Sequence, residues 1–581
     1  MDKGNEELMQ LLKELENVHY PPGCQFQRLQ RYKALHIQKD SDIDAIYNLV
    51  QSHSPGLRNK AVLRYEKLLS ADVEPICKIP LISTTEEIAL KCPTAEVNEN
   101  IRIMLRHIAE MPKEWTLVQL TPYYNPLDDI TEDNTIFKTN PIHISVFNCG
   151  QLDEEPFLVT VNPPIDSVNG SCIELVQEMM SIIRGNKEAL MSHKKKRQSI
   201  EDRLKAIIKD VQNLWFKEWR CLLSGKYIDA SLDEEIKLEL RNFFRMEFSK
   251  LEVTSKIISI LAYVVKGSVH LKLIEIKRAV QYCFPHIEDK NLLRSIIQFI
   301  RSLGDKLIAK GANTKKYPVI LILDDSLDCF PWEMIDILQD EPVSRVPSLQ
   351  FIYTLFKEHE KDIVNGHKIV LNYDKGAYIV NPDTDLKNME IRMMNFFNYW
   401  TPNWIGTSGY QPDSDEFFEL LTSSDIFSYN GHGSGSHLLS MDKIQRTHIK
   451  SVVLLFGCGS TKINRMDPQV EMYGPYHIPC MVGMLWEVTD LDTDVLTTEF
   501  MGQWIPSKAP IKWKYVDKTE WSKAEEIVKF VKDKKLTGEE MNYEPELLRA
   551  LSSAKKAVSF YGTRAACVAR GLPVKIQEKN I

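Results

Sequence analysis

The feature that most constrains the fold is a series of short, nearly continuous apolar runs in the second half of the chain, separated by stretches of helical periodicity. Such runs are typical of buried strands in a mostly parallel sheet with helices on both faces. Because active groups in such sheets gather at the carboxyl ends of the strands, the residues after each run are the candidates for chemistry. The runs lie at 318–323, 368–372, 426–429, 452–456 and 480–488.

The first half of the chain has a different pattern. Residues 1–95 have apolar side chains at helical spacing, as at 8–15, 45–50 and 61–69. Three later segments alternate β-branched or aromatic residues with polar ones and are predicted strands: 115–120, 142–148 and 156–161. Helical periodicity returns from 173 to about 309, which predicts a long helical insert.

Composition excludes several classes of protein. The chain has 72 Lys or Arg against 80 Asp or Glu, and its net charge of −8 argues against a dedicated nucleic-acid binder, which usually has a concentrated basic surface. No apolar window is long enough for a membrane span, and the N-terminus does not resemble a secretion signal. The 11 cysteines show neither disulfide nor zinc spacing, so we expect a reducing compartment and no structural metal. The sequence has no P-loop or other cofactor motif, so we expect no cofactor.

Two glycine-rich segments follow neighbouring candidate strands. The segment NGHGSG places His432 after the run at 426–429, and GCGS places Cys458 after the run at 452–456. A thiol with a pKa of about 8.5 is mostly protonated at neutral pH, and a nearby imidazole can accept its proton and later protonate a leaving amine. The backbone amides of Gly433 and Cys458 are the predicted donors to an oxyanion.

Other residues fit these roles less well. Cys480 begins an apolar run and is more simply a core thiol, and Cys329 has no flanking glycine. His437 lies close to His432 but precedes two leucines and also lacks flanking glycines. We therefore predict a Cys458 nucleophile with His432 as its base.

An acidic segment, EVTDLDTD at 487–494, leaves the last apolar run. It is compatible with an ordinary solvated loop. Carboxylates beside a nucleophile also suit a pocket for a basic substrate side chain, because a guanidinium is held best by a bidentate carboxylate.

At this point a family resemblance is evident, because several blocks occur in that family's order. They are LILDDSLDCFPWEMIDILQDEPVSRVPSL, AYIVNPDTDL, FSYNGHGSG, VVLLFGCGS, MLWEVTDLDTD and YGTRAACVARGLPV. The chain resembles separase, the caspase-like cysteine endopeptidase that cleaves cohesin at anaphase. The resemblance implies His432 as general base and acid, Cys458 as nucleophile, and the amides of Gly433 and Cys458 as the oxyanion hole.

The resemblance also implies a substrate pocket. Separases cut after Arg, and we favour Asp494 as the partner of that side chain, followed by Asp490. Asp492 of the same segment and Trp486, the residue before that segment, are also expected to bind substrate. The family usually has Asp where this chain has Glu487. No metal or cofactor is implied.

The implied fold is α/β plus all-α. A caspase-like, mostly parallel sheet flanked by helices at 312–581 would pack on a non-catalytic α+β substrate-binding domain at 96–311. That second domain would carry the helical insert at 173–309, and a short helical region at 1–95 would precede it.

The expected function is cleavage of the kleisin subunit of cohesin after Arg, releasing sister chromatids, under restraint by a securin-like inhibitor that lies in the cleft as a pseudosubstrate. Two alternatives remain open: a caspase-like pseudoprotease scaffold, and a caspase-like peptidase with an unrelated substrate. We expect a cytoplasmic protein with access to the nucleus or mitotic chromosomes. The basic stretch at 194–197 fits a nuclear import signal or, more simply, a solvated helix end.

Separases generally carry a long helical array before the protease, whereas only about 95 residues precede the expected substrate domain here. We therefore expect a separate helical scaffold subunit that docks on the N-terminal region. No direct contact with nucleic acid or membrane is expected.

Overall fold

The computed structural model describes thirteen segments of the chain. They are 23–38, 41–70, 96–124, 141–151, 154–162, 172–190, 194–247, 252–310, 315–438, 449–463, 478–525, 528–531 and 543–577. The predicted helical pattern at 8–15 lies outside these residues. The patterns at 45–50 and 61–69 fall in two helices, α3 and α4.

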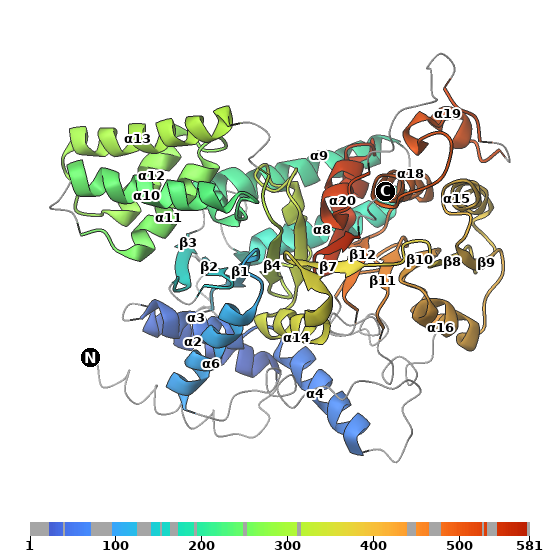
Figure 1. The fold of residues 1–581 in the computed structure, drawn as a ribbon, viewed down its shortest axis with the longest axis horizontal. Helices are drawn as coiled ribbons and strands as arrows, with labels where there is room; N and C mark the ends of the chain where they lie inside the picture. Colours follow the sequence, from blue (N-terminus) through green and yellow to red (C-terminus); the bar gives the residue numbers. More distant parts are fainter. Residues whose placement is uncertain are drawn as a thin grey trace.

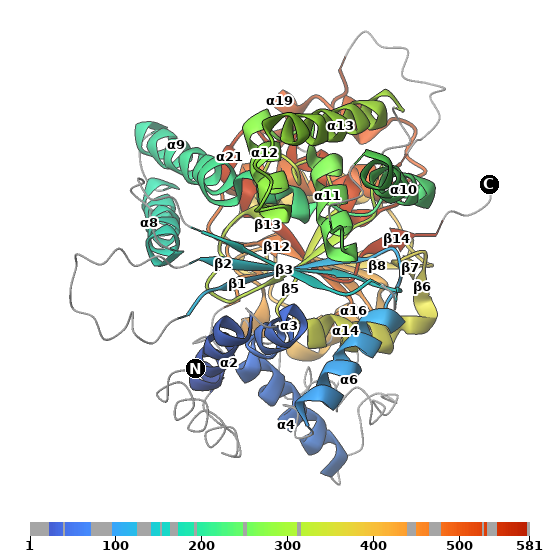
Figure 2. The same cartoon turned by 90° about the vertical axis from the view of Figure 1, so that its left-hand side faces the viewer.

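A central sheet of eleven strands crosses the described residues, in the order β3-β2-β1-β4-β5-β13-β12-β11-β10-β8-β9 (Figures 1 and 2). The strands are β1 Thr116–Pro122, β2 Ile142–Asn148, β3 Phe157–Val161, β4 Val319–Leu323, β5 Val343–Val346, β8 Gly376–Val380, β9 Ile405–Ser408, β10 Ile426–Asn430, β11 Val452–Leu455, β12 Cys480–Met484 and β13 Cys567–Gly571.

Most neighbouring pairs in this sheet are parallel. The antiparallel pairs are β1 with β2, β2 with β3, and β12 with β13. Strands β4, β10, β11 and β12 are buried at every position, which is why their sequences are continuous apolar runs instead of alternating ones. The predicted fold class, a mostly parallel sheet flanked by helices, is confirmed.

Helices cover both faces of the sheet (Figure 2). One face carries α2 Gly23–Ile37, α3 Asp42–Gln51, α4 Pro55–Ser70, α6 Val97–Glu110, α14 Leu349–His359 and α16 Ser414–Ser423. The other carries α8 Cys172–Leu190, α9 Lys194–Asp210, α10 Ala230–Glu247, α11 Ser255–Gly267, α12 Leu273–Cys283, α13 Lys290–Ala309, α15 Lys387–Trp400, α18 Asp490–Trp504, α19 Lys518–Trp521, α20 Leu547–Lys555 and α21 Tyr561–Ala566. Separate apolar cores lie on the two faces, so both faces of the sheet are buried.

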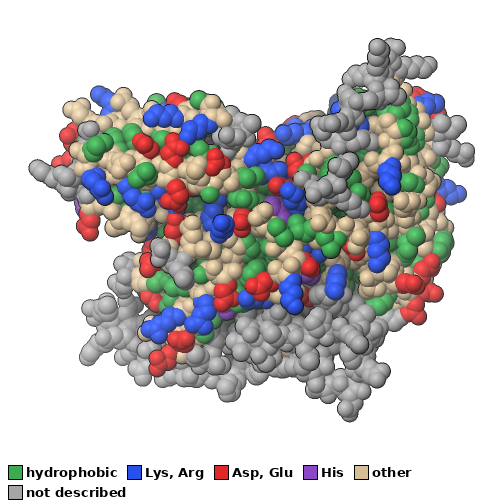
Figure 3. Space-filling model, in the orientation of Figure 1, with side chains coloured by type: hydrophobic (Ala, Val, Ile, Leu, Met, Phe, Trp, Pro, Cys, Tyr) green, Lys and Arg blue, Asp and Glu red, His purple; other side chains and the backbone are tan. Residues whose placement is uncertain are grey.

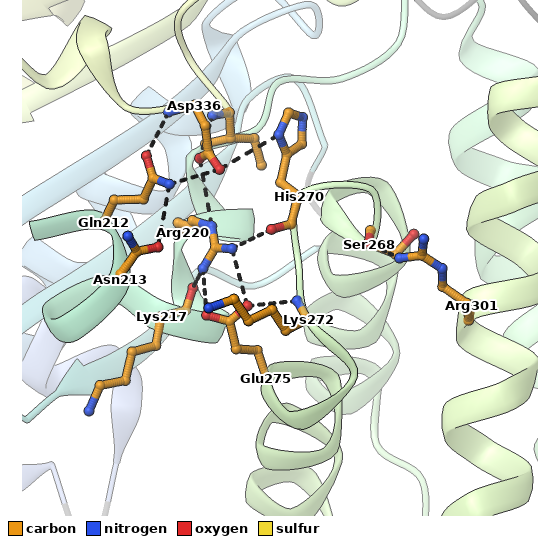
Figure 4. A network of polar contacts seen from close by, with 11 residues as sticks. Gln212, Asn213, Lys217, Arg220, Ser268, His270, Lys272, Glu275, Arg301 and Asp336 are labelled. Atoms are coloured by element: carbon orange, nitrogen blue, oxygen red, sulfur yellow. Dashed lines mark hydrogen bonds and ion pairs between the residues drawn. The ribbon is translucent and has the colours of Figure 1, made fainter. Parts of the chain in front are cut away.

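The predicted helical insert consists of α8 to α13, with the short helices Val211–Phe216 and Lys217–Leu223 between α9 and α10. Arg220 joins its parts (Figure 4). Its guanidinium pairs with both oxygens of Glu275 at 2.8 and 3.1 Å, and the amide of Gln212 donates to Asp336 at 3.0 Å. The insert is therefore tied to the segment that follows β4.

One predicted strand has a different position from the expected one. The run at 368–372 corresponds to β7 His367–Val370, which belongs to a separate three-stranded sheet with β6 Ile363–Val364 and β14 Val574–Ile576. Four strands of the central sheet, β5, β8, β9 and β13, were not predicted.

The expected boundary at 311/312 falls between α13 and β4. A single sheet crosses it, because β1 pairs in parallel with β4 from Thr116–Val319 to Leu120–Leu323. The division into an N-terminal region, a substrate-binding domain and a catalytic domain stays a prediction.

Within the described residues, no helix is long and apolar enough to cross a membrane. On the face shown in Figure 3, acidic and basic side chains are interspersed over the helical insert. The basic stretch at 194–197 forms the first turn of α9, where Lys195 and Lys196 are exposed and Arg197 is partly buried.

Candidate active site

Four neighbouring parallel strands place the candidate residues at one edge of the sheet. Strand β10 pairs in parallel with β8 on one side and with β11 on the other, and β11 pairs in parallel with β12. Their carboxyl ends therefore meet at the same edge. His432 follows β10, Cys458 follows β11 and the acidic segment follows β12, so all three predicted groups share that edge.

The loops that carry His432 and Cys458 are in direct backbone contact. A Cβ atom on Gly457 would lie 2.0 Å from the carbonyl oxygen of Gly433 and 2.5 Å from that of Gly431. Only glycine permits this approach. Phe456 also donates its backbone N–H to the carbonyl of Tyr429 at 2.8 Å, and the Tyr429 hydroxyl donates to the carbonyl of His432 at 2.9 Å. The two loops thus hold each other in place.

The Cys458 thiol is partly buried and held by one residue of the acidic segment. Its Sγ accepts from the backbone N–H of Val488 at 3.4 Å and donates to the carbonyl of Val488 at 3.5 Å. Burial raises the pKa of this thiol, the Val488 contact lowers it in part, and Glu487 and Asp490 raise it further. In this state the thiol is protonated at neutral pH, so the nucleophile needs a base.

His432 has a carboxylate partner that the sequence reasoning did not assign. Its Nε2 lies 3.1 and 3.0 Å from the two oxygens of Asp385, and both side chains are more than half exposed. Asp385 follows β8, the strand beside β10. The pair therefore lies at the same edge as the thiol.

The predicted oxyanion donors lie where a substrate has room. Gly433 has a φ of +59°, and a Cβ atom there would meet no atom within 4 Å. The backbone N–H of Cys458 lowers the pKa of its own thiol. The Cys458 amide therefore lies beside its own sulfur, and Gly433 borders open space, while the oxyanion role of the two amides stays a prediction.

The two carboxylates favoured for the substrate arginine bind an arginine of this chain. Arg392 of α15 donates from Nε to Asp494 at 2.7 Å and from Nη2 to Asp490 at 3.1 Å, in each case to Oδ2. Asp494 is buried, whereas nearly half of the Asp490 side chain is exposed (47%). Burial raises the pKa of Asp494 well above its usual value, and Arg392 opposes that rise.

The other two predicted substrate residues have different surroundings. Asp492 lies in the first turn of α18, where it accepts from the hydroxyl of Thr489 at 2.6 Å. Trp486 is buried and lines a cavity with apolar side chains of α8 and α9. Asn186 of α8 donates to the carbonyl of Glu487 at 2.8 Å. The helical insert therefore supports the segment that contacts the thiol.

The competing residues have no comparable arrangement. Cys480 is buried in β12, and burial raises its pKa to about 12. Burial and Asp328 do the same for Cys329. His437 lies 3.8 Å from Asp383, and both side chains are partly exposed.

A buried ion network lies behind the Cys458 loop. Arg570 of β13 pairs with both oxygens of Asp328 at 2.8 and 2.7 Å and donates to the carbonyl of Thr461 at 3.0 Å. Arg345 of β5 pairs with both oxygens of Glu333 at 2.7 and 2.5 Å and donates to the carbonyl of Asp328 at 2.6 Å. The network therefore joins β5 and β13 to Thr461, three residues after Cys458 in the same loop.

Two residues of the site were missed: Asp385 and Arg392. Asp385 lies in the NPDTDL block, and its distance in sequence from His432 gave no sign of contact. Arg392 lies in a helix and has no motif around it. Both contacts depend on which elements become neighbours in space.

Comparisons with known proteins identify the family of the chain. The family model for the separin protease domain matches residues 168–493, more than half of the chain. Separin of Mus musculus is 33% identical over 194 residues, covering 32% of this chain and 9% of that protein. Separin of Schizosaccharomyces pombe is 23% identical over 341 residues, covering 54% of this chain and 18% of that protein.

A solved structure shares the fold. The crystal structure of the Saccharomyces cerevisiae separase–securin complex at 2.6 Å resolution superposes with a TM-score of 0.68 and 16% identity, covering 98% of this chain and 37% of that one. The chain spans between 9% and 23% of the length of the curated separins it matches. By its sequence and its fold, the chain belongs to the separin protease-domain family.

Proposed function

We propose that the chain is a caspase-like cysteine endopeptidase that cleaves the kleisin subunit of cohesin after Arg, restrained by a securin-like inhibitor in its cleft, and that it acts where mitotic chromosomes are accessible. The observation that carries the catalytic part is the backbone contact between the His432 and Cys458 loops through Gly457. A pseudoprotease would need neither residue. The inhibitor rests on family membership and on the related chain solved with securin.

The chemistry follows from the positions of the groups. His432 accepts the proton of the Cys458 thiol, and the thiolate attacks the scissile carbonyl to give a tetrahedral oxyanion that the amides of Gly433 and Cys458 stabilise. The imidazolium then protonates the leaving amine, and an acyl-enzyme remains. Water, deprotonated by His432, releases the acid product and restores the thiol.

Covalent labelling tests the proposal. We expect an electrophilic peptide carrying Arg at P1 to modify Cys458, mapped by mass spectrometry, and a securin-like inhibitor to block the reaction. The exposed thiol of Cys24 is the internal control for unspecific reaction. Labelling of Cys24 at the same rate, or equal labelling of the Cys458→Ser variant, would reject the proposed mechanism.

For the substrate arginine we propose direct contact with Asp490, which is exposed, and support from Asp494, which fixes Arg392. We expect Asp490→Asn to lower kcat/KM for a P1-Arg peptide about tenfold to a hundredfold, because a charge-assisted hydrogen bond contributes about 1.5–3 kcal/mol. The rate of Cys458 alkylation by iodoacetamide should not fall, because Asp490 raises the pKa of this thiol and loss of its charge favours the thiolate.

The comparison with Asp494 separates specificity from stability. Asp494→Asn leaves the buried Arg392 with Asp490 as its carboxylate partner and should lower the free energy of unfolding by about 1.5–3 kcal/mol. If Asp490→Asn slows the alkylation of Cys458 by iodoacetamide as much as it slows peptide cleavage, Asp490 acts on the thiol and not on the substrate side chain.

A further inference from the structure

The Asp385–His432 contact is built by an unusual loop. Between β8 and α15 the chain contains two non-glycine residues with positive φ, Asn381 at +49° and Thr384 at +66°. A β-branched residue in this region is a conformational outlier, with a cost of about 1–3 kcal/mol. Such strain persists only where the surroundings impose it, and it gathers at functional sites.

The surroundings of Asn381 impose this conformation. Its backbone N–H donates to the carbonyl of Asn430 at 2.8 Å, at the end of the strand that carries His432. Its side chain accepts from the backbone N–H of Leu386 at 2.9 Å and donates to Glu390 at 2.7 Å. Asn381 thus fixes both ends of the loop, and Asp385 is the residue before Leu386.

We propose that Asp385 is a positioning residue for catalysis: it fixes the ring orientation and the tautomer of His432, so that Nδ1 exchanges the proton with the Cys458 thiol. This inference rests on the proposed cysteine-protease function. An ionised carboxylate only accepts hydrogen bonds, so the ring nitrogen at 3.0 Å, Nε2, carries a proton. The lone pair then lies on Nδ1, which takes the thiol proton.

The negative charge of Asp385 also favours proton transfer from the Cys458 thiol to His432. When the proton moves from Sγ to Nδ1, the ring becomes an imidazolium with a proton on each nitrogen, and the negative charge moves to sulfur. Asp385 stabilises that imidazolium and thereby favours the thiolate. The proton later leaves Nδ1 for the amine of the departing product, which restores the neutral ring.

The neighbouring residue supplies a matched control. Asp383 lies two residues earlier in the same loop and faces His437, at 3.8 Å, which the mechanism does not use. If any negative charge near the site changes the reactivity of Cys458, replacing Asp383 and replacing Asp385 should have similar effects. An effect through His432 would be specific to Asp385.

The test is the rate of Cys458 alkylation by iodoacetamide in the full chain, which needs no substrate and so reads the thiol even if the proposed cleavage fails. Asp385→Ala should slow alkylation about tenfold, since positioned acid–base groups contribute at least a hundredfold and orientation is part of that. Asp385→Asn, whose amide oxygen still accepts from Nε2, should recover part of the rate. Asp383→Ala should change nothing.

A double-mutant cycle makes the test decisive. In a His432→Ala background, Asp385→Ala should have no further effect, because Asp385 acts only through that ring. In peptide cleavage, Asp385→Ala should lower kcat and leave KM unchanged. Equal slowing with and without His432, or an Asp383→Ala effect as large as that of Asp385→Ala, would overturn the proposal.

Discussion

Replacing Gly457 by Ala is expected to slow peptide cleavage by about a hundredfold while the protein remains folded. The new Cβ would lie 2.0 Å from the Gly433 carbonyl oxygen, whereas ordinary contacts begin at 3.4 Å, so the two catalytic loops would separate by about 1.4 Å. The Cβ position is fixed by the backbone at 457 and the oxygen belongs to the Gly433 backbone, so neither atom can rotate away. A displacement of about 1 Å between reacting groups costs about a hundredfold in rate. Steady-state kinetics with a P1-Arg peptide measures the loss.

Gly459→Ala is the matched control for this prediction. Gly459 lies on the other side of Cys458 and has a φ of +60°, but a Cβ atom there meets nothing within 4 Å. This variant should lose about 1–2 kcal/mol of stability from left-handed strain and retain most of its activity. If Gly459→Ala is as inactive as Gly457→Ala, backbone conformation and not loop contact determines the geometry of the site.

The strands that carry the catalytic residues could be predicted because they are buried on both faces and consist almost entirely of apolar residues. Strands β10 and β11 are examples. The glycines around His432 and Cys458 then indicated tight turns at strand ends. At these positions the apolar strand pattern is followed directly by glycine-flanked reactive side chains, so the sequence was sufficient to propose the His432–Cys458 pair.

The missed strands show where pattern reasoning fails. Strand β5 has the sequence VSRV and β13 the sequence CVARG, and each contains an arginine that is buried because carboxylates pair with it. Periodicity treats a charged residue as exposed, so a paired charge in the core hides the strand. Strand β8 begins with glycine, and strand β9, with the sequence IGTS, has a single large apolar side chain, so the apolar pattern is weak in both.

The partners of the catalytic groups could not be predicted because they depend on the order of strands in space. Asp385 reaches His432 only because β8 lies beside β10, a neighbour distant in sequence. Arg392 reaches Asp490 and Asp494 only because α15 packs against α18. The sequence carries no local trace of either adjacency.

Replacing Arg345 by Met is expected to destabilise the fold by about 3–5 kcal/mol, because it leaves Glu333 as an unpaired charge in the core. Arg345 is fully buried and pairs with both Glu333 oxygens. Burial alone would raise the pKa of Glu333, but the Arg345 guanidinium more than offsets this, so the pKa lies below its usual value. Denaturant unfolding at pH 7.5 measures the loss, and exposed Arg102→Met should change stability by no more than about 0.5 kcal/mol.

The pH dependence of the free energy of unfolding shows whether Arg345→Met destabilises the fold through the lost charge pair or through lost packing. In the wild type the Glu333 contribution is present above its unfolded pKa of about 4.3 and disappears only as the pH falls through the lower folded value, so it is constant from pH 7.5 to 5.5. In Arg345→Met, burial raises the folded pKa above the unfolded one, so this variant should gain stability as the pH falls. Adding Glu333→Gln should remove that gain and recover part of the stability. A deficit that is independent of pH and unchanged by Glu333→Gln would mean that Arg345 stabilises the core by packing and by its bonds to the carbonyls of Asp328 and Phe330.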